Sequence, residues 1–323
     1  MVFFDRNKGP QTKESTLLNY EDRRPLIDNA ISIDQGGTRT RDDAIHHVYI
    51  PSDHQHVIRF YIADVPYHVA CGSELDEAAV RRTDQNIFPK EYLCRWSLEK
   101  ENDHPAVEFS FFMDDEMGTV QKLDILLVDV KLRDTYTFEY VSTVLSNPRH
   151  KENEFFASLL DVSKALSEHT KTQINFGPMR RKVQIGERIL GEFALHLNRE
   201  LARYCMKAKV PIMYRNTFSV KYLPEYVKKK YHEVRNTALS RREKPPSLGS
   251  TMLSHVPRYH KGLEQVGYAE FSSPLRSWVS LVNLRQIRAH MLGMPLPYSE
   301  AQIREFVEVS NLKSWEHFFA VRS

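Results

Sequence analysis

The first half of the chain alternates between apolar and polar residues. β-Branched and aromatic side chains recur at every second position in five segments, residues 30–33, 44–50, 57–65, 107–113 and 120–132. A strand places successive side chains on opposite faces, so a period of two indicates strands with one face against a core. We therefore expect an antiparallel or mixed sheet in the N-terminal half.

The second half has apolar residues at spacings of three and four, which is typical of amphipathic helices. The predicted helices cover residues 152–172, 183–208, 225–242, 277–292 and 299–321. A shorter helix interrupts the strands at residues 73–84, where Ser73 and Asp76 resemble a capping box. Strands followed by helices predict an α+β fold, with the N-terminal sheet packed against a mainly helical C-terminal half.

The loop at Pro245, Pro246, Ser247 and Gly249 has the composition of a domain linker. The apolar stripe of the final helices nevertheless needs a partner surface, and the N-terminal sheet is the obvious one. We therefore predict one domain over residues 1–323, with a tail at residues 1–21 and a C-terminal helix within residues 294–323.

Net charge is +3, but residues 201–261 hold 14 Lys or Arg against 3 Asp or Glu, including Lys228, Lys229 and Lys230. Such a basic block attracts polyanions, because binding releases their counterions. Nucleic acid is the commonest large polyanion in a cell, whereas a solvated helix face is the alternative explanation of the same charges.

The three cysteines, Cys71, Cys94 and Cys205, are odd in number and far apart. That spacing argues against a disulfide framework and against a zinc site. The first residues lack the apolar run of a secretory signal, and no window is apolar enough to span a membrane. We expect a cytoplasmic monomer with no membrane contact.

Acidic residues gather in the segment AISIDQGGTRTRDDAIHH, where a predicted strand ends at Asp34, a Gly36-Gly37 turn follows, and Asp42 and Asp43 precede the next strand. Three neighbouring carboxylates raise one another's pKa unless a cation lies between them. Such clusters commonly bind hard divalent ions, Mg²⁺ in particular. A turn that is rich in Asp and Gly for backbone reasons alone is the alternative.

Four separated blocks of the chain resemble the ribonuclease II catalytic domain, the RNB family, in order and spacing. They are IDQGGTRTRDDAI, FYIADVPYHVACGSELDEAAVRRTDQNIFP, RILGEFALHLNRELARYCMKAKVPIMYRN and HKGLEQVGYAEFSSPLRSWVSLVNLRQI. The resemblance covers residues 22–293. It implies an RNB-type fold and a hydrolytic 3′→5′ exoribonuclease that releases nucleoside 5′-monophosphates from single-stranded RNA.

Matched position by position, the resemblance assigns metal binding to Asp34, Asp42 and Asp43, with Mg²⁺ as the ion and Mn²⁺ as a substitute. Asp42 also acquires a catalytic role, in positioning the metal and the attacking water. Arg276 falls on the arginine that contacts the scissile phosphate. The fourth aspartate of the family is Thr40 here.

RNA contacts are expected from aromatic side chains, which stack on unpaired bases, and from lysines near the phosphates. The candidates are Phe88, Tyr204, Phe271, Trp278, Lys228, Lys229 and Lys230. The alternative for each aromatic residue is a place in the core. The family's tyrosine that clamps the 3′ end corresponds to Ile87.

Departures from the family pattern leave a second hypothesis open. Thr40 lacks a charge, and Arg41 could pair with a carboxylate and compete with Mg²⁺. A catalytically weak or inactive RNA-binding relative is therefore the alternative to an active enzyme. A third hypothesis is an unrelated α+β interaction protein with a fortuitous acidic turn. The chain also has too few residues outside the matched region for the flanking cold-shock and S1 modules.

Overall fold

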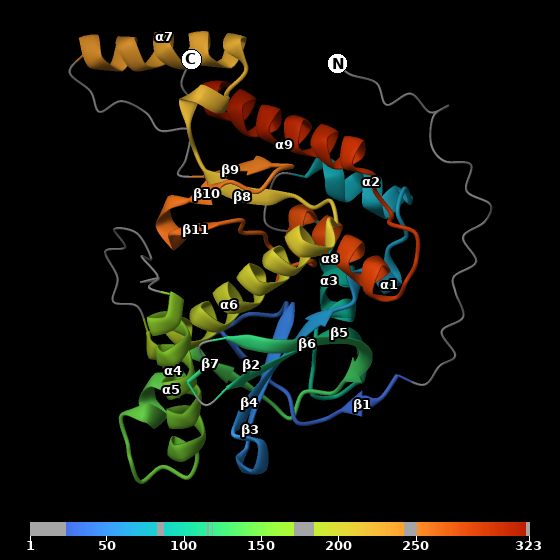
Figure 1. Cartoon of the computed structure of the whole chain (residues 1–323), viewed down its shortest axis with the longest axis vertical. Coiled ribbons are helices and arrows are strands. Elements are labelled where there is room, and N and C mark those ends of the chain that lie inside the picture. The colour runs from blue at the N-terminus through green and yellow to red at the C-terminus, as the bar shows by residue number, and fades with distance from the viewer. Residues whose placement is uncertain are drawn as a thin grey trace.

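The N-terminal half forms a long curled sheet in the computed structural model of the chain (Figure 1). The structure describes residues 24–82, 87–114, 116–117, 119–170, 184–241 and 251–320. Within these residues, seven strands make up the sheet in the order β1-β6-β5-β4-β3-β2-β7. Their bounds are β1 (Leu26–Ile27), β2 (Ile31–Asp34), β3 (Asp43–Ile50), β4 (Gln55–Ala63), β5 (His104–Asp114), β6 (Val120–Val130) and β7 (Asp134–Thr137).

The sheet is mixed, as the sequence predicts. Neighbouring strands from β2 to β6 run antiparallel, while β1 pairs with β6 and β7 with β2 in parallel. The five predicted strands are confirmed as β2 to β6. β7 was missed because its four residues, DTYT, are too few to show a clear alternation.

The helices carry most of the C-terminal half. They are α1 (Val65–His68), α2 (Glu74–Arg81), α3 (Lys90–Trp96), α4 (Phe138–Leu145), α5 (Asn153–Thr170), α6 (Ile185–Ala208), α7 (Glu225–Ser240), α8 (Trp278–Met291) and α9 (Glu300–Ala320). The six predicted helices are confirmed as α2 and α5 to α9. Ser73 caps α2 as expected, since its hydroxyl accepts a hydrogen bond from the Asp76 amide at 3.3 Å.

Two short strand pairs lie between the helices. β8 (Tyr214–Thr217) pairs with β9 (Thr251–Ser254), and β10 (Tyr259–His260) pairs with β11 (Gln265–Val266). Both pairs lie above the main sheet in Figure 1, between α6 and α7.

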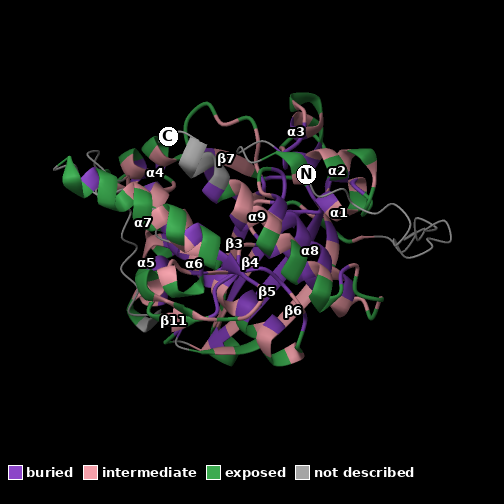
Figure 2. Cartoon of the chain, turned by 90° about the horizontal axis from the view of Figure 1, so that it is seen from above, coloured by how far each residue is buried: buried purple, intermediate pink, exposed green. Residues whose placement is uncertain are grey.

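Helices cover both faces of the sheet. Because successive side chains of a strand point to opposite faces, they contribute alternately to two separate cores. On one face Ile58, Phe60 and Ile62 pack with α5 and α6. On the other, Tyr61 and Ala63 pack with α3 and α8. Figure 2 shows buried residues concentrated where the strands pass beneath the helices. The α+β architecture therefore follows from alternation in the strands and apolar stripes on the helices.

Helix α7 stands apart from the other helices at the top of Figure 1. A small cluster holds it, in which Val227 of α7 and Leu223 before it pack against Trp315 of α9. Its outer face is exposed along most of its length (Figure 2).

Three further features bear on the expectations from sequence. Cys71, Cys94 and Cys205 are all free thiols. In the part of the chain that the structure describes, no helix combines the length and apolar character needed to cross a bilayer. The expected N-terminal tail at residues 1–21 and the loop at residues 245–249 lie outside the described residues.

Candidate active site

The acidic turn, residues 34–43, joins strands β2 and β3. Strand β2 delivers Asp34 at its last position, and the Thr38 amide closes a turn onto the Gln35 carbonyl at 3.1 Å. Gly37 has φ +84°, which a residue with a side chain rarely adopts, so glycine at this position permits the turn. Asp43 starts β3 opposite Ile62 of β4.

Arg276 lies against this turn, although 234 positions separate it from Asp42. Its Nε–H donates to Asp42 Oδ2 at 2.6 Å, and the Leu275 amide donates to Asp42 Oδ1 at 2.7 Å. The Asp42 side chain is fully buried, whereas the Arg276 side chain is 45% exposed. Within the described residues the two Nη groups of Arg276 make no hydrogen bond, so they can reach a ligand.

The segment that carries Arg276 is positioned by buried amide side chains. Asn198 of α6 accepts from the Phe271 amide at 2.8 Å, and Asn283 of α8 donates to the Glu270 carbonyl at 3.1 Å. Ser277 then caps α8 by accepting from the Ser280 amide. These bonds hold the backbone at residues 270–271 and at the start of α8, on either side of Arg276, and Asp42 orients the guanidinium itself.

Asp34 has different neighbours. The hydroxyl of Ser32 donates to Asp34 Oδ2, and Arg41 Nε lies 3.7 Å from the same oxygen. Ser97 in turn accepts from the Arg41 amide at 2.7 Å. The expectation that Arg41 is near a carboxylate is therefore confirmed for Asp34.

Ser32 and Ser97 are residues of the site that the sequence reasoning missed. Ser32 lies two positions before Asp34 on one strand, so the period of two already placed both side chains on one face. Ser97 acts on a segment 56 positions away, and no local pattern reveals such a contact.

The charges of the turn interact strongly. Burial, together with the carboxyl groups of Asp34 and Asp42, raises the pKa of Asp43 to about 8. Burial also raises the pKa of Asp34, against the opposing effects of Ser32, Arg41 and Arg276. Burial disfavours the charge on Arg276, but the carboxyl groups of Asp42, Asp43 and Asp34 together raise the Arg276 pKa above its ordinary value.

The turn offers oxygen donors of the kind that Mg²⁺ prefers. Repulsion among the three carboxyl groups is what a divalent cation would relieve, so the donor set fits such an ion in its chemistry. Among the described residues, however, no group of three or more His, Cys, Asp or Glu is gathered closely enough to hold a metal ion. The ion would require the side chains to move together.

The predicted stacking roles of three aromatic residues are corrected by their burial. Phe88 is 1% exposed and Phe271 0%. Trp278 is 9% exposed and packs edge-on against Phe306. All three rings belong to the hydrophobic cores on the two faces of the sheet, where a large apolar side chain is stabilised by burial.

The remaining RNA candidates are not fully buried, although Tyr204 packs against the core. Tyr204 of α6 is half-buried and its hydroxyl contacts the sulfur of Met291. Lys228, Lys229 and Lys230 lie on α7, where Lys228 pairs with Glu225 at 2.8 Å and the other two are exposed. Their contacts with RNA stay predictions.

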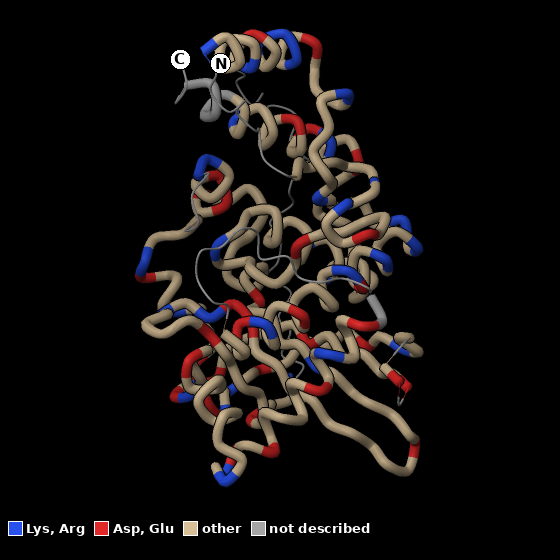
Figure 3. Tube along the Cα trace, turned by 90° about the vertical axis from the view of Figure 1, so that its left-hand side faces the viewer, with Lys and Arg blue, Asp and Glu red and all other residues tan. Residues whose placement is uncertain are grey.

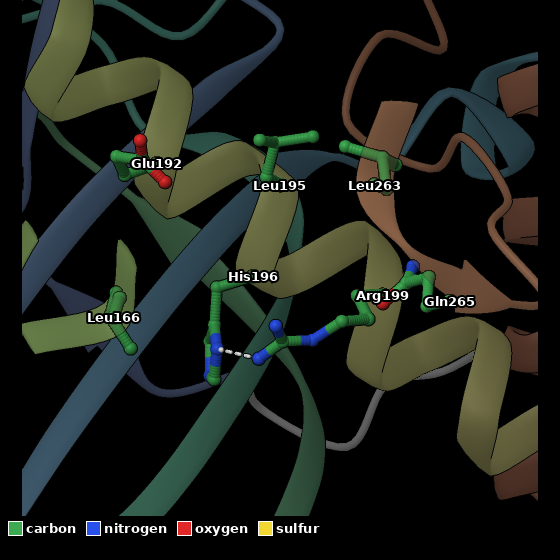
Figure 4. A pocket seen from close by; sticks show the side chains of 7 residues that line it. All are labelled: Leu166, Glu192, Leu195, His196, Arg199, Leu263 and Gln265. Atoms are coloured by element: carbon green, nitrogen blue, oxygen red, sulfur yellow. Dashed lines mark hydrogen bonds between the residues drawn. The ribbon is translucent and has the colours of Figure 1, made fainter. Parts of the chain in front are cut away.

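A pocket lies on another side of α6 (Figure 4). It is lined by Leu166, Glu192, Leu195, His196, Arg199, Leu263 and Gln265. Burial raises the pKa of Glu192 to about 7 and lowers that of His196 to about 3. None of the acidic-turn residues lines this pocket, so it is distinct from the turn.

Comparison with known proteins identifies the same region of the chain as the sequence motifs do. The family model described as RNB domain matches residues 22–293. Ribonuclease R of Thermotoga maritima is 24% identical over 93% of the chain and 50% of its own length. The chain spans about half the length of the curated relatives it matches.

Solved structures share the fold. Mycoplasma genitalium RNase R in complex with ribose-methylated single-stranded RNA superposes with a TM-score of 0.70 at 15% identity, over 95% of this chain and 59% of that one. Yeast Ssd1, described as a pseudonuclease, gives a TM-score of 0.70 at 13% identity, over 95% and 45%. The expected RNB-type architecture is thereby confirmed.

Proposed function

The chain belongs to the RNB domain family, and on that premise we propose that it is a hydrolytic 3′→5′ exoribonuclease that acts on single-stranded RNA. Its products are nucleoside 5′-monophosphates, and its catalysis depends on a divalent metal. An RNase R of this fold has been solved with single-stranded and with double-stranded RNA, which supports RNA as the substrate class.

The proposal depends on one observation above all: the Nε–H of Arg276 donates to Asp42 Oδ2 at 2.6 Å. A guanidinium and a buried carboxylate from distant parts of the chain converge beside two further acidic side chains. Breaking a phosphodiester requires positive charge at the phosphoryl oxygens and a group that orients water, and these residue types supply both.

Asp42, Arg276 and Leu275 have separate roles in this proposal. Asp42 holds the guanidinium of Arg276 in place through Nε, which leaves the Nη groups for two phosphate oxygens. A planar fork suits this role better than the point charge of a lysine. Leu275 contributes through its amide, which fixes the Asp42 carboxylate so that Arg276 cannot drift.

Asp34 and Asp43 would hold the divalent ion, with Asp42 beside them. When bound, Mg²⁺ would supply charge next to the phosphate and lower the pKa of a water. The proton that Asp43 retains up to about pH 8 must leave before this carboxylate binds a cation.

The test is incubation of the protein with 5′-labelled oligoadenylate and Mg²⁺, with and without chelator. The expected result is a chelator-sensitive ladder of shortened products that retain the label. Mononucleotides as the released species would establish exonucleolytic cleavage. Full-length RNA after incubation at protein excess would overturn the proposal.

A second candidate function is RNA binding without turnover. It is favoured by the 3.7 Å approach of Arg41 to Asp34, by Thr40 at the family's aspartate position, and by the separation of the carboxylates. A pseudonuclease shares this fold, so the architecture alone does not decide between the two. Binding of the labelled RNA without shortening would favour this candidate.

A further inference from the structure

We propose that an exposed surface outside the acidic turn, the tyrosine platform, docks single-stranded RNA by stacking its bases. The platform consists of Tyr222, Tyr226, Tyr259, Lys221, Arg258 and Lys261. The inference depends on the proposed RNA substrate, and it names where the strand is held beyond the site of cleavage.

Three tyrosine rings of this surface lie in solvent. Tyr226 is 62% exposed, Tyr259 54% and Tyr222 40%. They belong to the first turn of α7, to β10 and to the 3-10 helix Val220–Tyr222. The exposed rings of Tyr226 and Tyr259 provide stacking faces, which the buried Phe88, Phe271 and Trp278 do not. One face of the Tyr222 ring is covered by Arg258, so this pair can stack only through its outer side.

Cations accompany the rings. The Arg258 guanidinium lies 3.8 Å from the centre of the Tyr222 ring, and the Lys221 ammonium lies 4.7 Å from it. Residues 217–241 and 251–266 together hold eight Lys or Arg against three Asp or Glu. Figure 3 shows the basic residues along α7, the helix at the top of that view. This charge is complementary to a phosphate backbone.

The platform has a fixed base. Val227, Tyr231 and Val234 on the inner face of α7 belong to the hydrophobic cluster that contains Trp315 of α9. On the other side, the buried Asn216 accepts from the Arg258 amide at 3.1 Å. The rings are therefore mounted on packed elements, which reduces the entropy lost when a strand binds.

The chain leads directly from the platform to the acidic turn. Residues 267–276 follow β11 and end at Arg276. Arg215 of β8 secures this connection, since its amide donates to the Tyr268 carbonyl at 2.7 Å and its Nε lies 2.7 Å from Glu270. Most of residues 267–275 are buried, so this connection holds the platform and Arg276 in one packed unit but does not itself line the path of the RNA.

Single strands suit the platform better than duplexes. Stacking on a tyrosine needs a base whose face is open, and in a duplex both faces are covered by neighbouring pairs. Phosphate contacts from the lysines alone would not distinguish the two forms, because they carry no information on base pairing.

The experiment measures binding of fluorescent oligoadenylate of about 20 nucleotides in chelator, so that cleavage cannot interfere. The triple variant Tyr222→Leu, Tyr226→Leu, Tyr259→Leu removes the rings and keeps every charge. We expect it to bind at least about 10-fold more weakly than the parent. The corresponding triple Phe variant should bind within about twofold of the parent, because it keeps the stacking faces.

The control is Tyr49→Leu, which removes a tyrosine of β3 that is 39% exposed at the opposite end of the molecule. Circular dichroism and thermal unfolding of all variants exclude misfolding. Equal affinity of parent and Leu variant would overturn the platform and leave the exoribonuclease proposal standing. Tighter binding of a duplex than of a single strand would also overturn the platform. No binding of single strands at all would count against both proposals.

The two proposals can fail separately. If the Leu variant loses affinity while the parent never shortens RNA in Mg²⁺, the platform stands and the enzymatic function falls. If the parent shortens RNA and the Leu variant binds as well as the parent, the reverse holds.

Discussion

Two of the buried carboxyl groups among the described residues have contrasting surroundings, Asp42 in the acidic turn and Glu192 in the pocket beside α6. Asp42 is 1% exposed and Glu192 6%. Asp42 receives Arg276 at 2.6 Å and a backbone amide at 2.7 Å. The arginine nearest Glu192 in the pocket, Arg199, bonds instead to Glu200 at 3.0 Å and to His196 at 3.3 Å.

The contrast shows what burial does to a carboxyl group with and without a bonded cation. At Glu192, desolvation dominates and the pKa rises to about 7. At Asp42, desolvation also raises the pKa, but Arg276 and the Leu275 amide oppose the rise. A bonded arginine therefore favours the charged form of a buried acid, and Glu192 has no such partner within the described part of the chain.

The most severe test of the difference between Asp42 and Glu192 is Asp42→Asn, which keeps the shape of the side chain and removes its charge. Arg276 then loses its ionic anchor, and the turn loses a carboxylate. We expect a fall in the cleavage rate of at least about 10²–10³-fold. A gel assay with labelled RNA measures the rate, and anisotropy should show RNA binding within a few-fold of the parent.

The control for that variant is Asp53→Asn, which makes the same chemical change at an exposed position. Parental cleavage by the Asp42→Asn protein would remove Asp42 from the catalytic assignment.

Arg276→Lys tests whether the fork, and not merely the charge, is needed. Lysine cannot bond Asp42 and two phosphate oxygens together, so a rate loss of about 10²-fold is expected. Single-turnover kinetics at saturating RNA separate this loss from weaker binding. Arg304→Lys on the exposed side of α9 is the matched control, and an equal loss in both would point to a general effect of charge geometry.

The contrast can be sharpened by adding the carboxylate that the family has at position 40. Thr40→Asp should lower the Mg²⁺ concentration needed for half-maximal cleavage by about 10-fold. Thr38→Asp adds the same charge to the same turn away from that position. A Mg²⁺ titration that is shifted equally by both variants would show that net charge, and not a ligand, is responsible.

The smallest expected effect concerns Glu192→Gln. Because burial raises the folded-state pKa to about 7, above the ordinary 4.5, neutral Glu192 favours folding at low pH. That contribution is complete below about pH 4.5 and is lost as the pH rises through 7. Glutamine never ionises. Between pH 4.5 and 7, the free energy of unfolding should therefore fall by about 1–2 kcal/mol less in the variant than in the parent.

Urea unfolding at the two ends of that pH range measures the difference. Glu139→Gln on the exposed face of α4 is the control and should leave the pH dependence of the parent unchanged. An identical dependence in the parent and in Glu192→Gln would mean that Glu192 is already solvated.

Much of this structure could be predicted from local patterns. Alternation located β2 to β6, and the three-to-four spacing located α5 to α9. The turn between Asp34 and Asp43 was evident from its two glycines. These features depend on residues a few positions apart, which is the range over which periodicity and turn preferences act.

Long-range features were harder. The approach of Arg276 to Asp42 came from family resemblance, because no periodicity links positions so far apart. Phe88, Phe271 and Trp278 were wrongly assigned to RNA stacking for a related reason: a ring on an apolar face looks the same in sequence whether it meets a base or the core. Tyr222, Tyr226 and Tyr259 were overlooked because exposure depends on what packs nearby.

The bond between the Leu275 amide and Asp42 has a consequence for assembly. It joins residues 233 positions apart, so the pairing of Arg276 with Asp42 depends on a non-local contact that closes late in folding. During synthesis the carboxylate emerges long before its arginine. A partly synthesised chain therefore lacks the pair, and under the proposed function it would lack the activity as well.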